Sequence, residues 1–400
     1  MKLRNFYFIL LGGGLLMACS LPKPWPQLSI ESVTTPTSTN CVFPTLSSNQ
    51  DAIWMGWLDE SKDSLNQYKV AAFDGQQWSS PELAAAGRDW FVNWADYPSI
   101  TVGPKQNIYV HTLEKSGVDV YAYDIKVRNR SHIGAWSTAI KPYQDTSATE
   151  HGFPSFVPLS GERLAAIWLD GRNYIKGGSE EMMLAYTTIE GGQASQKVQF
   201  LDRRICDCCQ TDMAMSSQGL VAVYRDRSPQ EVRDIYIVRQ IGETWTEPKP
   251  IHNDQWKISG CPVNGPAITA KGDTLAVAWF TSAGGEARVL ASMSFDAGET
   301  FGNPVLIDAG QALGRVDIEF DNQNQAWVSW LRKEADTGQI RICTFRADGS
   351  KSEAIKVSEI NPRRKSGFPQ LHYWQKHLWL AWTETEPQNQ IQFVKISIDG

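Results

Sequence analysis

An aromatic-rich strand pattern returns seven times along this chain of 400 residues, at intervals of 51 to 57 residues. The residues that mark it are Trp57, His111, Trp168, Tyr224, Trp279, Trp330 and Trp382. A repeat of this length indicates an array of equivalent units, each of which buries its apolar faces against its neighbours. The chain is therefore expected to form one repeat domain, although its length alone would suggest several domains.

Each repeat contains three or four short strand signals. The third repeat, for example, opens on the apolar segment Phe153-Pro154-Ser155-Phe156 and continues about ten residues later in a second apolar run at 164–168. Three or four antiparallel strands per repeat form one blade of a β-propeller. The sequence thus predicts an all-β propeller with seven blades, and six blades with an N-terminal appendage is the alternative.

The seventh repeat has a third strand signal at 391–396, and no fourth signal follows it. Its outer strand must therefore come from elsewhere in the chain. Residues 27–33 read as a strand and are the candidate. Pairing the two ends of the chain in one blade would leave only short, protected sheet edges.

The first nineteen residues carry two basic residues, an apolar stretch from Phe6 to Met17 and a small-residue segment that ends at Cys19. The stretch is too short to span a bilayer and is typical of an export signal. Its end resembles the lipobox of bacterial lipoproteins, which implies lipidation of Cys19. A serine follows the cysteine, as in lipoproteins sorted to an outer membrane. An ordinary secretory signal with a chance cysteine is the alternative.

These signals divide the chain into a lipoprotein signal peptide (1–19), a tether rich in Pro, Ser and Thr (20–38) and a single propeller domain (39–400). The expected location is the cell envelope, with attachment to the membrane through lipid. The net charge of −6 and the pI of about 5.6 argue against nucleic acid as a partner.

Polar residues of unusual type gather where first strands begin and second strands end, which is one face of an up-and-down blade. Starts of first strands bring Asp96, Glu150, His151, Asn264, Arg315 and Asp317 to this face. Ends of second strands bring Asp170, Arg172, Arg225, Asp226, Arg233 and Asp234. Arginine suits a carboxylate or phosphate ligand because its fork binds both bidentately. Neighbouring arginines and aspartates often only pair with each other.

Cysteine is the more specific signal on this face. Six cysteines follow the leader, among them Cys206, Cys208 and Cys209 in one loop and Cys261 at the matching entry of the next blade. In an exported chain such a set is typical of a disulfide that joins the two loops. The alternative is a thiolate metal site for copper or zinc, helped by His151.

One motif resembles a known superfamily. Its positions are Ser294, Asp296, Gly298, Thr300 and Phe301, and they match the Asp-box of sialidase-like propellers with BNR repeats. The resemblance covers the propeller as a whole. It implies a hairpin between third and fourth strands that the Asp side chain and the Gly turn stabilise, and it implies no catalytic role for the box itself.

Resemblance to an active sialidase would further imply a three-arginine clamp, a Tyr nucleophile activated by Glu and an Asp acid/base. The Arg-Ile-Pro motif of the first arginine is replaced here by Cys41-Val42-Phe43-Pro44. A substitute clamp would use Arg172, Arg225, Arg233 and Arg315, with Tyr224 and Glu231 as nucleophile pair and Asp96 or Asp170 as acid.

The sequence favours a lipid-anchored module that binds a ligand, a glycan or an envelope protein through its Cys/Arg/Asp-rich face. A sialidase-like glycoside hydrolase with an altered clamp is the alternative, and a copper- or zinc-binding protein is the lesser one. The sequence leaves open whether the protein is an enzyme.

Overall fold

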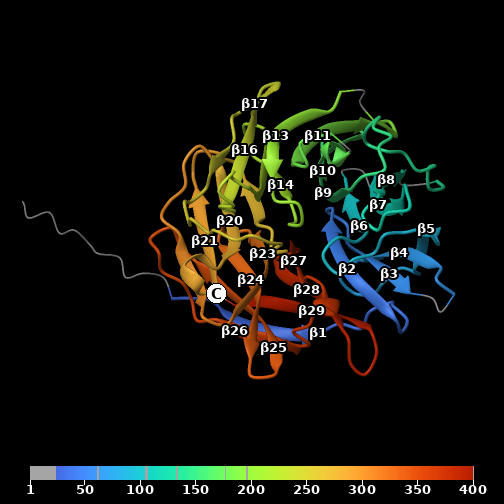
Figure 1. The fold of residues 1–400 in the computed structure, drawn as a ribbon. Coiled ribbons are helices and arrows are strands. Elements are labelled where there is room, and N and C mark those ends of the chain that lie inside the picture. The colour runs from blue at the N-terminus through green and yellow to red at the C-terminus, as the bar shows by residue number, and fades with distance from the viewer. Residues whose placement is uncertain are drawn as a thin grey trace, which may run out of the picture.

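The chain folds into seven antiparallel sheets arranged in a ring (Figure 1). The structure is a computed structural model, which describes residues 24–60, 63–103, 107–131, 134–175, 177–194 and 197–399. The first strands of neighbouring blades contact each other all the way round the ring. The protein is therefore a seven-bladed β-propeller, as the repeat period predicts, and the six-bladed alternative is wrong.

The first three blades follow one another along the chain and differ in their outer strands. Blade 1 contains β2 (Cys41–Ser48), β3 (Ile53–Glu60), β4 (Asn66–Phe73) and β5 (Glu82–Gly87). Blade 2 contains β6 (Ser99–Val102), β7 (Ile108–Lys115) and β8 (Tyr123–Arg130). Blade 3 contains β9 (His151–Pro158), β10 (Arg163–Asp170), β11 (Met182–Glu190), β12 (Gln193–Ala194) and β13 (Gln199–Ile205).

The remaining blades complete the ring. Blade 4 contains β14 (Asp212–Met215), β15 (Leu220–Arg225), β16 (Ile235–Ile241), β17 (Thr244–Trp245) and β18 (Lys249–Pro250). Blade 5 contains β19 (Ala267–Lys271), β20 (Thr274–Thr281), β21 (Arg288–Ser294) and β22 (Val305–Ala309). Blade 6 contains β23 (Ala312–Phe320), β24 (Ala326–Glu334), β25 (Thr337–Phe345) and β26 (Ile355–Ile360), and blade 7 contains β27 (Gln370–Trp374), β28 (His377–Glu384), β29 (Gln390–Asp399) and β1 (Gln27–Ser32).

Three single-turn 3₁₀ helices lie in connections of the described chain. They are η2 (Arg172–Tyr174), η3 (Ala283–Gly285) and η4 (Arg364–Ser366). Among the described residues we find no helix with the length and hydrophobicity that crossing a membrane requires.

The hydrophobic core lies between adjacent blades. The tryptophans that mark the repeat are at most 1% exposed in four blades, namely Trp57, Trp168, Trp279 and Trp330. Each packs against the preceding blade, as Trp168 does in one cluster with Ile125 and Trp279 in one cluster with Ile237. Burying a side chain of this size contributes on the order of 3 kcal/mol. The aromatic residues thus recur along the sequence once per blade because each one packs in the interface with the preceding blade.

The ring closes through the N-terminal strand. β1 pairs antiparallel with β29, from Gln27 opposite Asp399 to Ser32 opposite Val394, and the two strands run side by side at the base of the ring in Figure 1. Closure by this strand confirms the sequence prediction. The segment that the sequence assigns to a tether therefore supplies a blade strand, whereas the predicted signal peptide and Cys19 lie outside the described residues.

Blade 2 differs from its sequence prediction at the third strand. The apolar run at 120–124 has the sequence pattern of a third strand, but β8 begins only at Tyr123. Residues 116–122 instead form a turn, in which the Ser116 amide donates to the Ala122 carbonyl at 3.0 Å. The turn leaves Tyr121 in a loop, where its side chain is 55% exposed.

Candidate functional site

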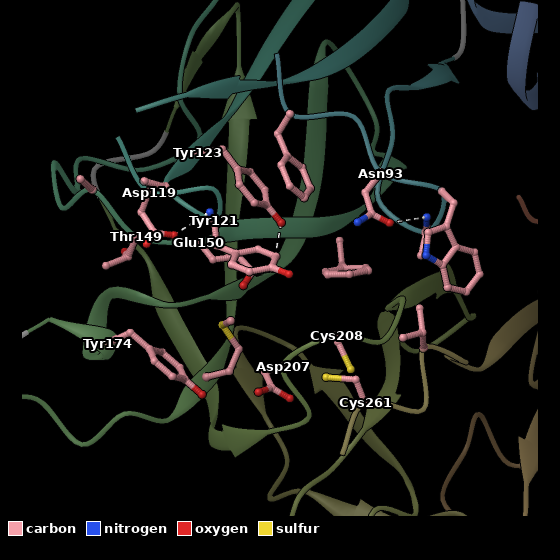
Figure 2. Close-up of a pocket in the computed structure, with 18 of the residues that line it drawn as sticks. Asn93, Asp119, Tyr121, Tyr123, Thr149, Glu150, Tyr174, Asp207, Cys208 and Cys261 are labelled. Carbon is pink, nitrogen blue, oxygen red and sulfur yellow. Dashed lines mark hydrogen bonds between the residues drawn. The ribbon is translucent and has the colours of Figure 1, made fainter. Parts of the chain in front are cut away.

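A pocket with a volume of about 690 Å³ opens on the face where the loops entering the blades meet the loops between second and third strands (Figure 2). Loops of blades 2 and 3 supply Tyr121, Glu150 and Tyr174, and loops that enter blades 4 and 5 supply Cys208 and Cys261. The sorting of polar residues to one face, inferred from blade geometry, thus brings distant parts of the sequence together in one cavity.

Three side chains from blades 2 and 3 form a hydrogen-bonded group on the pocket wall. The Tyr123 hydroxyl lies 2.9 Å from Asp96 Oδ2 and 2.8 Å from Glu150 Oε1. Its ring stacks on Phe91 with centroids 4.0 Å apart. Figure 2 shows Tyr123 and Glu150 pointing toward one another across the cavity wall. Asp96 is 3% exposed and stands behind Tyr123, so that only Glu150 and Tyr123 line the pocket.

This group holds a proton at neutral pH. A tyrosine hydroxyl has one hydrogen, so it can donate to one carboxylate only and must accept from the other carboxyl. Burial raises the pKa of Asp96 to about 7. Burial, together with the charges of Asp96, Asp207 and Cys261, raises the pKa of Glu150 to about 8. Burial, and then the two carboxylates, hold the pKa of Tyr123 well above its usual range.

The backbone around the group leaves no room for a further side chain. Asp96 Oδ1 accepts from the amide of Phe153 at 3.0 Å. A Cβ atom on Gly152 would lie 2.3 Å from Asp96 Oδ2 and 2.5 Å from the Tyr123 hydroxyl. Only glycine therefore fits at the start of β9 while both hydrogen bonds of Tyr123 are kept.

The rest of the pocket combines aromatic side chains with acidic ones. Its aromatic lining residues are Phe91, Trp94, Tyr121, Tyr123, Phe153 and Tyr174. Asp119 and Asp207 join Glu150 as acidic groups, and Arg364 is the one basic residue among the described lining residues. Arg364 also lies over the Trp94 ring, 5.6 Å from its centroid. Acidic residues thus outnumber basic ones in the described lining.

The arginines that were expected to clamp an anion are used by the fold. Arg225 is 2% exposed and donates to the carbonyl oxygens of Asn264, Arg233 and Phe280 at 2.6 to 3.0 Å. Arg315 is 6% exposed and donates to Ser366 Oγ at 2.8 Å and to the carbonyl of Gly367 at 2.9 Å. Burial lowers the pKa of Arg315 to about 10. Both guanidinium groups brace loops of neighbouring blades.

Arg172 and Arg233 are engaged as well. Arg172 forms a bidentate pair with Asp170, at 2.6 and 2.7 Å. Arg233 donates to Glu231 Oε2 at 2.8 Å, and its other nitrogen lies 3.2 Å from Cys206 Sγ and 3.3 Å from Asp207 Oδ1. The four arginines do not converge on one empty position, so the substitute clamp is not assembled.

Replacing Arg225 by alanine should destabilise the fold rather than weaken a ligand site selectively. Three buried carbonyls would lose their donor, which should lower the free energy of unfolding by about 3 kcal/mol or more. Urea unfolding would measure this loss of stability. Arg227→Ala is the control, because Arg227 is partly exposed and pairs with Glu231. Removing such an ion pair should lower the free energy of unfolding by about 1 kcal/mol or less. Unchanged stability of Arg225→Ala would contradict the bracing role.

The structure does not bring Tyr224 and Glu231 together as a nucleophile pair. The Tyr224 hydroxyl donates to Asp202 Oδ2 at 2.6 Å, whereas Glu231 pairs with Arg227 and Arg233. Tyr224 is buried in the core cluster of blades 3 and 4. The structure instead combines a tyrosine with carboxylates at Tyr123.

The other polar residues singled out from the sequence have structural partners. Asp317 accepts from the Leu371 amide at 2.7 Å, and Asp234 accepts from the amides of Gln255 and Trp256 at 2.9 and 3.0 Å. Asn264 Oδ1 accepts from the Arg315 amide at 2.8 Å, and the Asp226 amide donates to the Asp234 carbonyl at 3.0 Å. Asp170 accepts from the Trp168 indole at 2.9 Å, and His151 lies 3.2 Å from Asp145.

The cysteine loops lie side by side, as the sequence suggests. The sulfur of Cys206 is 3.3 Å from that of Cys209 and 3.8 Å from that of Cys208. Cys208, Asp207 and Cys261 form a second group of ligand atoms within 4.8 Å of one another. No cysteine pair of the described chain is joined in a disulfide. The cluster could hold a metal ion, and the groups that gather among the described residues do not include His151.

The Asp-box segment forms a compact turn between β21 and β22. Asp296 Oδ1 accepts from Ser294 Oγ at 2.7 Å and from the Thr300 amide at 2.8 Å, and the Gly298 amide donates to Ser294 Oγ at 2.8 Å. Phe301 packs against the core cluster of blades 4 and 5. These contacts hold the turn between the two strands together.

Sequence reasoning placed Asp96 and Glu150 on this face but missed Tyr123, which joins them through its hydroxyl group. The available signal was weak: two acids, Asp96 and Glu150, precede the first strands of successive blades. Tyr123 gave no signal because it belonged to a run interpreted as an ordinary strand.

Comparison with known proteins establishes the fold and stops there. No family model matches the sequence, and no curated protein matches it. A protein of unknown function from Dyadobacter fermentans DSM 18053 superposes with a TM-score of 0.53 at 9% identity, over 93% of this chain and 99% of that one. A polysaccharide lyase gives 0.50 at 9% identity over 89% of both chains, and a mutant NanB sialidase from Streptococcus pneumoniae gives 0.47 at 12% identity over 95% and 71%. At such identities the shared feature is the β-propeller fold.

Proposed function

We propose that the pocket binds a carbohydrate and that Glu150, supported by Tyr123 and Asp96, performs acid–base chemistry on it. The observation that carries this proposal is the Tyr123 hydroxyl between two carboxyl groups on the wall of a cavity of about 690 Å³. Titratable groups with strongly perturbed pKa values in a cavity are typical of sites that transfer protons. The polysaccharide lyase among the structural neighbours agrees with a carbohydrate ligand.

The lining of the pocket suits a sugar. Aromatic side chains such as Tyr121 and Tyr174 provide flat apolar surfaces with a polar tip, which can cover the apolar faces of a pyranose ring. Carboxylates such as Asp119 and Asp207 accept hydrogen bonds from hydroxyl groups. Pockets that combine apolar walls with a few polar groups are the usual form of small-ligand sites.

A neutral sugar fits the charge of the site better than an acidic one. A sialidase needs arginines for the substrate carboxylate, and the four candidates are occupied by internal partners. Arg364 is the one basic residue among the described lining residues, and Asp119 and Asp207 outnumber it even when Glu150 holds its proton. This balance favours a neutral glycan over a sialoside.

The geometry supports glycoside hydrolysis as the reaction. Glu150 in its protonated form would donate its proton to the glycosidic oxygen as the bond to the anomeric carbon breaks. A water molecule would add its hydroxyl to that carbon, and its proton would restore Glu150. Tyr123, held by Asp96, keeps Glu150 oriented. Each turnover then consumes one water and leaves the protein unchanged.

Binding to a panel of neutral, sialylated and uronate oligosaccharides would test the proposal, with titration calorimetry as readout. We expect a neutral oligosaccharide to bind, and Tyr121→Ala to weaken its binding about tenfold through loss of a stacking surface. Val120→Ala is the matched control, because Val120 is equally exposed, at 58%, but does not line the pocket. Binding of acidic saccharides alone, or of none, would refute the neutral-glycan assignment.

Export and lipid anchoring at Cys19 belong to the same proposal, and so does residence in the cell envelope. They are supported by the leader sequence alone, with its apolar stretch and its lipobox-like end. Mass spectrometry of the N-terminal peptide would test them, since a diacylglyceryl group on Cys19 is the expected modification.

A further inference from the structure

The sulfurs of three cysteines are arranged as ligands of one metal ion. Cys206, Cys208 and Cys209 have their Sγ atoms within 4.8 Å of one another, and Cys206 Sγ lies 3.3 Å from that of Cys209 and 3.8 Å from that of Cys208. Metal–sulfur bonds of about 2.3 Å place neighbouring sulfurs about 4 Å apart in a three-coordinate site. The observed triangle therefore needs only a small expansion to admit an ion.

The protein supplies positive charge beside this triangle. Arg233 lies 3.2 Å from Cys206 Sγ through a guanidinium nitrogen. Arg225 lies next to Arg233, because its guanidinium group donates to the Arg233 carbonyl at 2.6 Å. A site with three thiolates around a monovalent ion carries two net negative charges, and the two guanidinium groups offset part of that charge.

We propose that Cys206, Cys208 and Cys209 bind a single Cu(I) ion. Thiolates are soft ligands, and they select Cu(I) and zinc over harder ions. Structural zinc sites are almost always tetrahedral with four ligands, whereas Cys261 shares Cys208 with the triangle but does not belong to the group whose three sulfurs lie within 4.8 Å of one another. Three thiolates that share no fourth ligand favour the monovalent ion.

The ion would be reached from the glycan pocket. Cys206 and Cys209 are buried, while Cys208 is partly exposed and lines the pocket together with Cys261. Figure 2 shows the Cys208 and Cys261 side chains next to each other at the floor of the cavity. Cys261 is thus placed to receive the ion first and pass it inward to Cys208.

Titration of the full chain with Cu(I) would test this assignment. The chain is purified without oxygen under reducing conditions, and Cu(I) is supplied by a coloured chelator whose loss of copper is followed by absorbance. We expect one Cu(I) per chain and a thiolate-to-copper charge-transfer band.

Variants distinguish this site from a general affinity of thiols for copper. Cys208→Ser changes a partly exposed ligand and should weaken Cu(I) binding more than about 100-fold, since even outer-shell partners such as Arg233 are worth about 10–100-fold. Cys343→Ala removes a buried thiol in β25, far along the chain from the cluster, and should bind Cu(I) like the wild type. Circular dichroism would confirm that both variants are folded.

Three results would overturn the proposal. The first is a wild-type chain that takes up no Cu(I) although its thiols titrate as free. The second is a Cu(I) affinity of Cys208→Ser equal to that of the wild type. The third is tighter binding of zinc than of Cu(I), with four sulfur ligands around zinc in X-ray absorption. None of these measurements uses a saccharide, so the copper site and the glycan proposal stand or fall separately.

Discussion

Replacing Gly152 by alanine should break the hydrogen-bond pair of Tyr123 and lower the free energy of unfolding by about 1–3 kcal/mol. The added Cβ would lie 2.3 Å from Asp96 Oδ2 and 2.5 Å from the Tyr123 hydroxyl. Neither partner can yield easily, because Tyr123 is stacked on Phe91 and Asp96 is held by the Phe153 amide. The cost combines overpacking with buried polar groups left without partners.

Thermal unfolding and saccharide turnover would both report this change. Gly302→Ala is the matched control, because a Cβ there would meet only the Met293 carbonyl oxygen at an ordinary 3.7 Å. The control should keep the melting temperature and activity of the wild type within a small margin. Full activity of Gly152→Ala would show that the pair of contacts to Tyr123 is dispensable, and the proposed chemistry would have to be abandoned.

Glu150→Gln should reduce glycoside cleavage by about 10²- to 10⁴-fold while leaving saccharide binding nearly intact. The Gln amide can still hydrogen-bond to the Tyr123 hydroxyl, but it has no acidic proton that it could transfer to the leaving oxygen. Asp119→Asn is the control, since Asp119 lines the same pocket without contacting Tyr123. Rates that fall equally in the two variants would point to pocket charge rather than to proton transfer.

The pH dependence of cleavage should follow the protonated form of Glu150. Activity is expected to fall as pH rises through about 8, because Glu150 loses its proton there. Burial, and then the charges of Asp96, Asp207 and Cys261, raise its pKa to this value. In the folded protein the pKa values of Asp96 and Glu150 lie well above the usual carboxyl value near 4. The free energy of unfolding should therefore decline as pH rises from about 4 to about 8. Glu150→Gln should remove the alkaline fall of the residual rate.

The architecture could be predicted from the sequence because its signals are periodic and local. Trp168 and Trp279 recur with the interfaces between blades, and the strand at 27–32 has the alternation of a β-strand that lacks a local partner. These features depend on the chain's own pattern of apolar residues, which the sequence displays directly.

The candidate site could be predicted only in part. Blade geometry placed Asp96 on the correct face, but the meeting of Asp96 and Glu150 at Tyr123 depends on a turn at 116–122 that has no strong sequence signal. The sequence analysis assigned Arg225 and Arg315 to a ligand because both carry a charge. Their hydrogen-bond acceptors are backbone carbonyl oxygens, which no sequence pattern identifies. Buried arginines with backbone partners are therefore hard to separate from binding arginines.

The pairing of β1 with β29 also fixes when the ring can be completed. β1 is made near the start of synthesis, yet its partner is almost the whole chain length away. A contact of such sequence separation forms late, since a very long loop must close first. Until β29 has been synthesised, β28 is the open edge of blade 7 and can pair with a strand of another chain. Chains that stop short of β29 should therefore aggregate more readily than full-length chains, in which this edge is covered.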